Sequence, residues 1–217
     1  MCGRFTANVK KKELEEEWNL AVPVEFKPRY NIAPSQLHPI IAGENAPGFN
    51  MFQWGLVPEW TKKEDGAKPL INTRIESLES GKISLHTPCL IPATSWFEWM
   101  QDKARQPFLL RPADLKLFAF AGICHSHKLP DGTKHNSFSI VTTEAAKVIS
   151  HIHKRMPLII GKDVEAEWLK LKPGQAINTF KENASGFKYE FYPVSSLVNK
   201  PVNDSEDVLK EFRETLF

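Results

Sequence analysis

The sequence predicts an α+β fold in a single domain over residues 1–217, with mainly antiparallel strands and a few peripheral helices. Short runs rich in β-branched and aromatic residues recur along the chain, and turn residues bound them. Their spacing is too irregular for βαβ units. No repeat, low-complexity segment or Pro/Gly/Ser linker divides the chain. These three observations favour one domain in which the sheet is mainly antiparallel.

The first half of the chain begins with a predicted helix at residues 9–20, where Leu14 and Trp18 lie four residues apart among charges. The stretch 28–36, "PRYNIAPSQ", carries two prolines and an asparagine and predicts an ordered, non-helical loop. Strands are then expected at six places: 38–42, 49–54, 88–93, 106–112, 116–123 and 137–143.

Three further helices are expected in the second half. Residues 143–153, "TEAAKVISHIH", combine a threonine cap with apolar residues three and four apart. The segments 163–171 and 205–217 are also predicted as helices.

Composition sets the broad class. A hydrophobic share of 41%, with 14 Phe and 6 Trp, is enough for a sizeable core. The formal net charge of +2 neither requires nor excludes a nucleic-acid partner, because a local basic patch can lie inside a near-neutral total. Three scattered cysteines do not form a disulfide framework. No signal peptide opens the sequence, and no run approaches the roughly 18 apolar residues of a membrane helix. We expect a soluble, intracellular protein.

The cysteine at position 2 is the first candidate for chemistry. Removal of Met1 would give Cys2 a thiol and a free α-amine on adjacent carbons. Their reference pKa values are roughly 8.5 and 8, so both are partly nucleophilic at neutral pH. An aldehyde can form an imine with the amine, and the thiol can then close a five-membered thiazolidine ring. The alternative is that a cysteine occupies position 2 by chance and has no chemical role.

Glu98 lies among aromatic residues in "TSWFEWM", residues 94–100. In a strand, Trp96 and Glu98 share one face, whereas Phe97 and Trp99 share the other. Apolar neighbours raise the pKa of a carboxyl, which suits general acid–base work. A surface glutamate on an edge strand is the alternative.

His153 and Arg155 follow the predicted helix at 143–153. His153 titrates in a range that allows proton transfer, and Arg155 is suited to holding a phosphate. A histidine that caps the last helix carbonyls is the structural alternative.

The stretch 69–78, "PLINTRIESL", places Asn72, Arg74 and Glu76 two apart, on one face of an extended segment. An amide beside a guanidinium suits contact with phosphates or base edges. Any solvated strand face has the same appearance.

Two other signals are weaker. Cys124, His125 and His127 are of types that bind zinc, but they are crowded and lack a defined fourth ligand, so no metal and no cofactor is expected. Trp60 precedes two lysines and is placed to stack a base, although a buried structural tryptophan is the common case.

Taken together, eight stretches resemble the SRAP (SOS-response-associated peptidase) family. They run in order over almost the whole chain: "MCGRF" at 1–5, "RYNIAPSQ" at 29–36, "WGLVPEW" at 54–60, "INTRIES" at 71–77, "IPATSWFEW" at 91–99, "SIVTTEA" at 139–145, "HKRMPLII" at 153–160 and "YPVSSLVN" at 192–199. The resemblance implies a compact, mainly β, barrel-like domain with a positively charged groove.

The resemblance also implies an activity. Members of the family sense abasic sites in single-stranded DNA, and the mature N-terminal cysteine forms a thiazolidine crosslink with the aldehyde of the opened sugar. It implies that Cys2 is the nucleophile, that Asn72 positions the N-terminus or sugar, and that Glu98 and His153 transfer protons. The residues implied in DNA binding are Arg4, Arg74, Arg155 and Trp60.

Two alternatives remain open. One is an N-terminal-nucleophile peptidase in which Cys2 removes its own leader, and the other is a module that binds single-stranded DNA without covalent chemistry. We further expect a monomer without a membrane partner. The expected location is the cytoplasm, near the nucleoid, in a bacterium, or the nucleus in a eukaryote.

Overall fold

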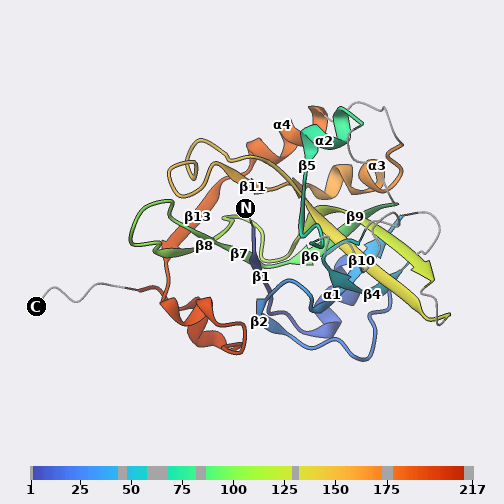
Figure 1. Ribbon diagram of the computed structural model, residues 1–217, viewed down its shortest axis with the longest axis horizontal. Coiled ribbons are helices and arrows are strands. Elements are labelled where there is room, and N and C mark those ends of the chain that lie inside the picture. The colour runs from blue at the N-terminus through green and yellow to red at the C-terminus, as the bar shows by residue number, and fades with distance from the viewer. Residues whose placement is uncertain are drawn as a thin grey trace, which may run out of the picture.

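Five strands close into a barrel in the computed structural model. In ring order they are β3 (Leu37–Ala42), β4 (Phe49–Trp54), β10 (Lys134–Glu144), β9 (Phe118–Lys128) and β6 (Thr87–Ala93), which pairs back to β3. Those labelled β4, β6, β9 and β10 lie in the right-hand part of Figure 1. Only the β4–β10 pairing in this ring is parallel. Closure satisfies the strand edges, which would otherwise be open to pairing with other chains.

The structure describes residues 2–43, 48–57, 68–81, 87–128, 132–172 and 178–212. Each of the six predicted strands corresponds to a strand of the observed sheets, although the strands predicted at 106–112 and 116–123 begin only at Pro107 and Phe118. The α+β class and the mainly antiparallel, barrel-like architecture are therefore confirmed.

The long strand β10 is paired along its whole length. β9 and β4 hold its first part, and β11 (Arg155–Pro157) and β5 (Asn72–Arg74) hold its last residues. A further short strand, β12 (Ile159–Ile160), pairs with β9. This arrangement brings two segments with candidate residues, β5 and β11, to opposite edges of one strand.

A second antiparallel sheet adjoins the barrel, in the order β13 (Tyr189–Pro193), β8 (Pro107–Pro112), β7 (Ser95–Trp99), β1 (Arg4–Ala7) and β2 (Arg29–Ile32). Only Thr94 separates β6 of the barrel from β7. The buried Thr6 hydroxyl lies 2.6 Å from the Thr94 hydroxyl and 2.7 Å from that of Ser95. These hydrogen bonds fix the corner at which the chain changes sheets.

Two hydrophobic clusters fill the interior, and β7 lies between them. Trp96 belongs to the main cluster inside the barrel, whereas Phe97 belongs to a smaller cluster with Val198 and Val208. Trp99 packs against the smaller cluster. The predicted alternation of faces along this strand is thus confirmed, and it puts Glu98 on the same side as Trp96.

Helices are short and lie outside the sheets. They are α1 (Lys11–Trp18), α2 (Ile75–Glu79), α3 (Glu165–Leu169) and α4 (Asn178–Gly186), with 3₁₀ turns η2 (Lys162–Val164), η3 (Ser196–Asn199) and η4 (Glu206–Leu209). The predicted helices at 9–20 and 163–171 correspond to α1 and to η2–α3. In the part of the chain that the structure describes, no helix has the length and apolar character to cross a membrane.

The predicted helix at 143–153 is wrong. β10 continues through Glu144, and turns follow up to Ile152. Ile149 N–H donates to Ala146 O and Ile152 N–H to Ile149 O, both at 3.0 Å. The apolar spacing of three that suggested a helix instead matches these i→i+3 turns, which bury Ile149 and Ile152.

Three other expectations need correction. The loop predicted at 28–36 contains the strand β2, which pairs with β1. The extended stretch 69–78 becomes helix α2 after Arg74. The helix predicted at 205–217 is only the turn η4 as far as Leu209, after which Glu211 bridges to Val194 in extended form. Residues 213–217 lie outside the described residues.

Candidate active site

Cys2 lies two residues before β1, the strand between β7 and β2 in the second sheet. It is fully buried, and its Sγ donates to Arg4 O at 3.5 Å. β1 runs antiparallel to β7 with Arg4 opposite Phe97, so the residues before Arg4 lie alongside Glu98 and Trp99. Burial, followed by the charge of Glu98, raises the pKa of the Cys2 thiol well above its usual value.

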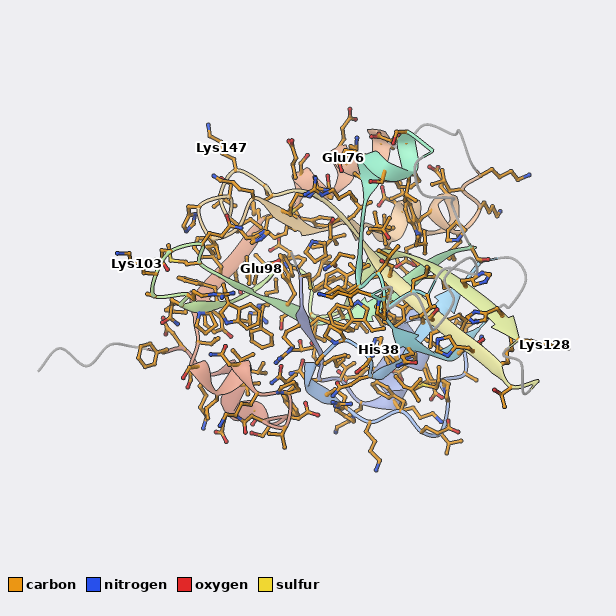
Figure 2. All side chains as sticks on the ribbon, in the orientation of Figure 1. His38, Glu76, Glu98, Lys103, Lys128 and Lys147 are labelled. Atoms are coloured by element: carbon orange, nitrogen blue, oxygen red, sulfur yellow. The ribbon has the colours of Figure 1, made fainter. Side chains whose placement is uncertain are left out.

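Glu98 is a carboxyl in the interior of the protein, as Figure 2 shows by contrast with Lys103, Lys128 and Lys147 at its rim. Its side chain is 2% exposed, and burial raises its pKa from 4.5 to about 7. A carboxyl with this pKa is present in both protonation states at neutral pH. It can therefore both donate and accept a proton there.

Asn72 connects the barrel to the N-terminus. β5 pairs with β10 and carries Asn72 to the start of β1, where its Nδ2 donates to Cys2 O at 2.8 Å. On the same strand Thr73 is buried and Arg74 is exposed. The alternation predicted from the sequence holds here, since Asn72 and Arg74 share the polar face. It ends at Glu76, which lies on α2.

His153 and Glu98 line the same cavity, of about 260 Å³. The backbone of Arg155 contacts His153 Nδ1 through both its N–H, at 3.0 Å, and its carbonyl oxygen, at 2.9 Å. Partial burial lowers the pKa of His153, so the ring is mainly neutral at physiological pH and is suited to accept a proton. The other side chains around the cavity come from the end of β7 and the loop after it: Trp99, Met100, Gln101, Asp102 and Arg105.

Two of the predicted phosphate-binding arginines are held by protein groups. Arg155 donates to both carboxylate oxygens of Glu76, at 2.7 and 2.9 Å, and to Thr142 O at 2.7 Å. Arg4 donates to Asn31 Oδ1 at 3.0 Å, and its other bonds go to backbone carbonyls of η3. The predicted stacking residue Trp60 lies outside the described residues.

Arg4 belongs to a network that the sequence did not indicate. Buried Asn31 donates from Nδ2 to the carbonyls of Val198, Lys200 and Asn203. Asp204 accepts from the Tyr30 and Asn31 N–H groups and forms an ion pair with Arg29. We call this network the terminal clamp, because it fastens residues 198–204 to β1, which follows Cys2 in the chain, and to β2, which pairs with β1.

Arg105 was also missed. Its side chain lines the cavity, and its only sequence signal is its place in the polar loop that follows Glu98. The zinc candidates are separated by the strand: Cys124 is buried, and His125 and His127 stack on the other side of β9 with ring centroids 5.4 Å apart. Within the described ranges no group of three metal-ligating side chains lies together.

The fold and site define a class of protein in which a cysteine at position 2 lies beside a buried carboxyl, with a histidine on the same cavity. The chain belongs to the family described as SOS response associated peptidase (SRAP), whose model matches residues 1–201.

Several relatives resemble the chain in sequence, and one solved structure resembles it in fold. The chain is 34% identical to "Abasic site processing protein YoqW" of Bacillus subtilis (strain 168), over 97% of this chain and 99% of that protein. It is 27% identical to "Abasic site processing protein YedK" of Escherichia coli, over 97% and 99%, and 24% identical to "Abasic site processing protein HMCES" of mouse, over 96% and 75%. A crystal structure of a Bacteroides thetaiotaomicron protein has the same fold, with a TM-score of 0.81 at 22% identity, over 98% of this chain and 100% of that one.

Proposed function

We propose that this protein processes abasic sites in single-stranded DNA by forming a thiazolidine crosslink through Cys2. The observation that carries the proposal is the meeting of three segments far apart in the chain. Cys2, Asn72 and Glu98 come from the start of β1, from β5 and from β7, and Glu98 shares a cavity with His153. The names of the relatives as abasic site processing proteins support the same substrate.

The reaction needs no external reagent. Removal of Met1 frees the α-amine of Cys2. This amine attacks the aldehyde of the opened sugar, and loss of one water gives an imine. The thiol then adds to the imine carbon, a C–S bond forms, and the proton of the thiol passes to the nitrogen. Ring closure is intramolecular and is favoured by proximity.

Each polar group has a defined role in this proposal. Glu98, with a pKa of about 7, donates a proton as the sugar opens and water leaves, and accepts the proton of the thiol. The raised pKa of Cys2 keeps its thiol protonated at neutral pH. The thiol can still react, because a nearby base removes its proton as the C–S bond forms. His153, which lines the same cavity, transfers protons at the sugar oxygen. Asn72 holds the carbonyl of Cys2 and thereby fixes the direction of its amine.

The buried thiol favours an unpaired strand as the substrate. An aldehyde must reach Cys2 beside a cavity of about 260 Å³, and an unpaired nucleotide turns into such a site without the cost of unstacking a duplex. Exposed Arg74 lies on β5, two residues from Asn72, and is placed to meet a flanking phosphate. Arg4, Arg155 and Trp60 remain further candidates for DNA contact.

Intact-mass spectrometry tests the proposal. The purified protein is mixed with a uracil-containing single-stranded oligonucleotide treated with uracil glycosylase, and the same oligonucleotide without glycosylase is the control. We expect a starting mass without Met1, and a heat-stable gain of one oligonucleotide less one water only with the treated DNA. Met1 absent with no adduct would shift the assignment to a peptidase or a simple DNA-binding module. Met1 retained would mean that the amine is blocked.

A further inference from the structure

Two adjoining hollows lie on a part of the surface that shares no lining residue with the cavity of Glu98 and His153. Their volumes are about 570 and 450 Å³, and Glu17, Leu115 and Leu117 line both. They therefore form one continuous depression between α1, the connection from β8 to β9, η2–α3 and α4. We call it the acidic groove.

The floor of the acidic groove is apolar. Phe118, Ile160 and Val164 are buried beneath it, and Leu115, Leu117 and Phe187 line it as partly exposed side chains. A hollow of several hundred Å³ with an apolar lining is in the usual range for a pocket that receives large side chains or a small ligand. An occupant must therefore bring apolar groups.

The walls of the groove are negatively charged. Six wall carboxylates belong to its lining: Glu13, Glu16, Glu17, Asp114, Asp163 and Glu182. The lysines among its described lining residues are Lys116 and Lys162. Lys116 is paired with Glu13, and Lys162 with Glu17 at 3.1 Å. The groove is thus strongly negative on a chain whose formal net charge is +2.

A buried carboxylate adds to this charge. Glu165 is 8% exposed, and both of its oxygens accept from Trp18 Nε1, at 3.0 and 3.2 Å. Lys162 Nζ lies 3.3 Å from Glu165 and 4.7 Å from the centre of the Trp18 ring. These contacts fix one wall of the groove in place before any partner arrives.

We propose that the acidic groove is a docking site for a segment of a partner protein in which large apolar side chains alternate with lysine or arginine. Carboxylate walls repel DNA phosphates, so the nucleic acid bound at the proposed active site does not compete for this surface. Charge complementarity selects a cationic partner, and the apolar floor requires anchor side chains that a simple polyamine lacks. The docking site is independent of the proposed crosslinking and adds a means of placing the protein near other proteins.

The probe is a fluorescein-labelled peptide, Lys-Lys-Leu-Lys-Phe-Leu-Lys-Lys, titrated with the full chain and followed by fluorescence anisotropy. We expect saturable binding that weakens about tenfold in the triple variant Glu17→Lys, Asp163→Lys, Glu182→Lys. The matched control, Glu25→Lys, Glu144→Lys, Glu206→Lys, makes the same change of charge on exposed residues outside the groove. It should lower affinity by no more than about twofold, because separated surface charges are screened by salt.

Two further measurements separate a built site from general attraction of charge. A peptide with serine in place of leucine and phenylalanine should bind at least about tenfold more weakly, and Thr179→Trp, which fills the larger hollow, should weaken binding of the original peptide. Equal binding of the two peptides, or equal loss in both triple variants, would overturn the proposal. So would a dimer of the free chain in sedimentation that the groove variant abolishes, because the occupant would then be a second copy. Circular dichroism and the rate of adduct formation check that the variants stay folded.

Discussion

Two glutamates are almost completely buried in the part of the chain that the structure describes, Glu98 at 2% and Glu165 at 8% exposure, and burial raises the pKa of both. Their surroundings differ. Glu165 receives an indole N–H and a lysine, each of which favours its charged form and opposes the effect of burial. Glu98 lies beside a thiol and a cavity, and its pKa reaches about 7. Burial alone therefore does not identify an acid–base group, and the neighbours of the carboxyl decide whether it serves structure or chemistry.

The largest expected effect comes from removing the Cys2 thiol, from which Glu98 accepts a proton in the proposed reaction. Cys2→Ala should abolish the covalent adduct, because it takes away the thiol, and should leave salt-sensitive binding of single-stranded DNA. Denaturing gel electrophoresis measures the first and anisotropy the second. Cys89→Ala, which removes another buried thiol, is the control and should still crosslink. Loss of DNA binding in Cys2→Ala would contradict this division of roles.

Matched amide substitutions test the comparison directly. Glu98→Gln should slow adduct formation at pH 7 about 100-fold, because the amide cannot transfer a proton. Glu165→Gln should leave that rate within about twofold and lower the free energy of unfolding by about 1 kcal/mol, through weaker bonds to Trp18 and Lys162. Single-turnover kinetics and denaturant titration give the two values. Similar rates of adduct formation in both variants would show that Glu98 does not transfer a proton in the reaction.

The pH dependence of stability gives a smaller signal. Because the pKa of Glu98 rises from 4.5 to about 7 on folding, the folded protein binds more protons between these values. The stability that this group contributes is present below pH 4.5 and is lost as the pH rises through 7, by roughly 3 kcal/mol in total. Thermal unfolding of the wild type and Glu98→Gln at pH 4.5, 6 and 7.5 should show the variant gaining relative stability with pH. Parallel profiles would mean that Glu98 does not titrate in this range.

The smallest effect concerns Arg155, whose partner Glu76 lies on the surface. Glu76→Gln should lower the free energy of unfolding by about 0.5 kcal/mol and raise affinity for single-stranded DNA a few-fold, because it frees a guanidinium for a phosphate. Glu79→Gln breaks the neighbouring ion pair with Lys181 and is the control. Unchanged DNA affinity in Glu76→Gln would assign Arg155 to structure alone.

The sequence was informative where side chains alternate. The barrel strands β3, β4, β6, β9 and β10 follow from β-branched and aromatic runs, and the two faces of β7 follow from its period of two. Apolar spacing was misleading in short turns. The spacing of Ile149 and Ile152 suits a turn as well as a helix, and the helix predicted at 143–153 was therefore wrong. The short strand β2 was missed because Asp204, 173 residues from Asn31, holds its backbone, and no local pattern shows such a contact.

In the candidate site, too, local sequence signals predicted single residues but not the contacts between distant ones. An acid among aromatic residues and an N-terminal thiol are local signals, and the raised pKa of Glu98 agrees with the first. Their proximity depends on pairing of β1 with β7 and of β5 with β10, which no local pattern specifies. For Arg4 and Arg155 the sequence indicates the charge but not the partner, and both side chains form hydrogen bonds within the protein. Which groups an arginine meets depends on the whole fold.

The terminal clamp has a consequence for synthesis. The bonds that fix β1 and β2 come from residues 198–204, which are made long after β1 and β2 themselves. While the chain is being made, Arg4 and Asn31 have no such partners, so the strand that carries Cys2 is not yet anchored by them. Cys2 thus obtains its complete setting only after residues 198–204 have been made, and a nascent chain that stops before them lacks these anchoring bonds.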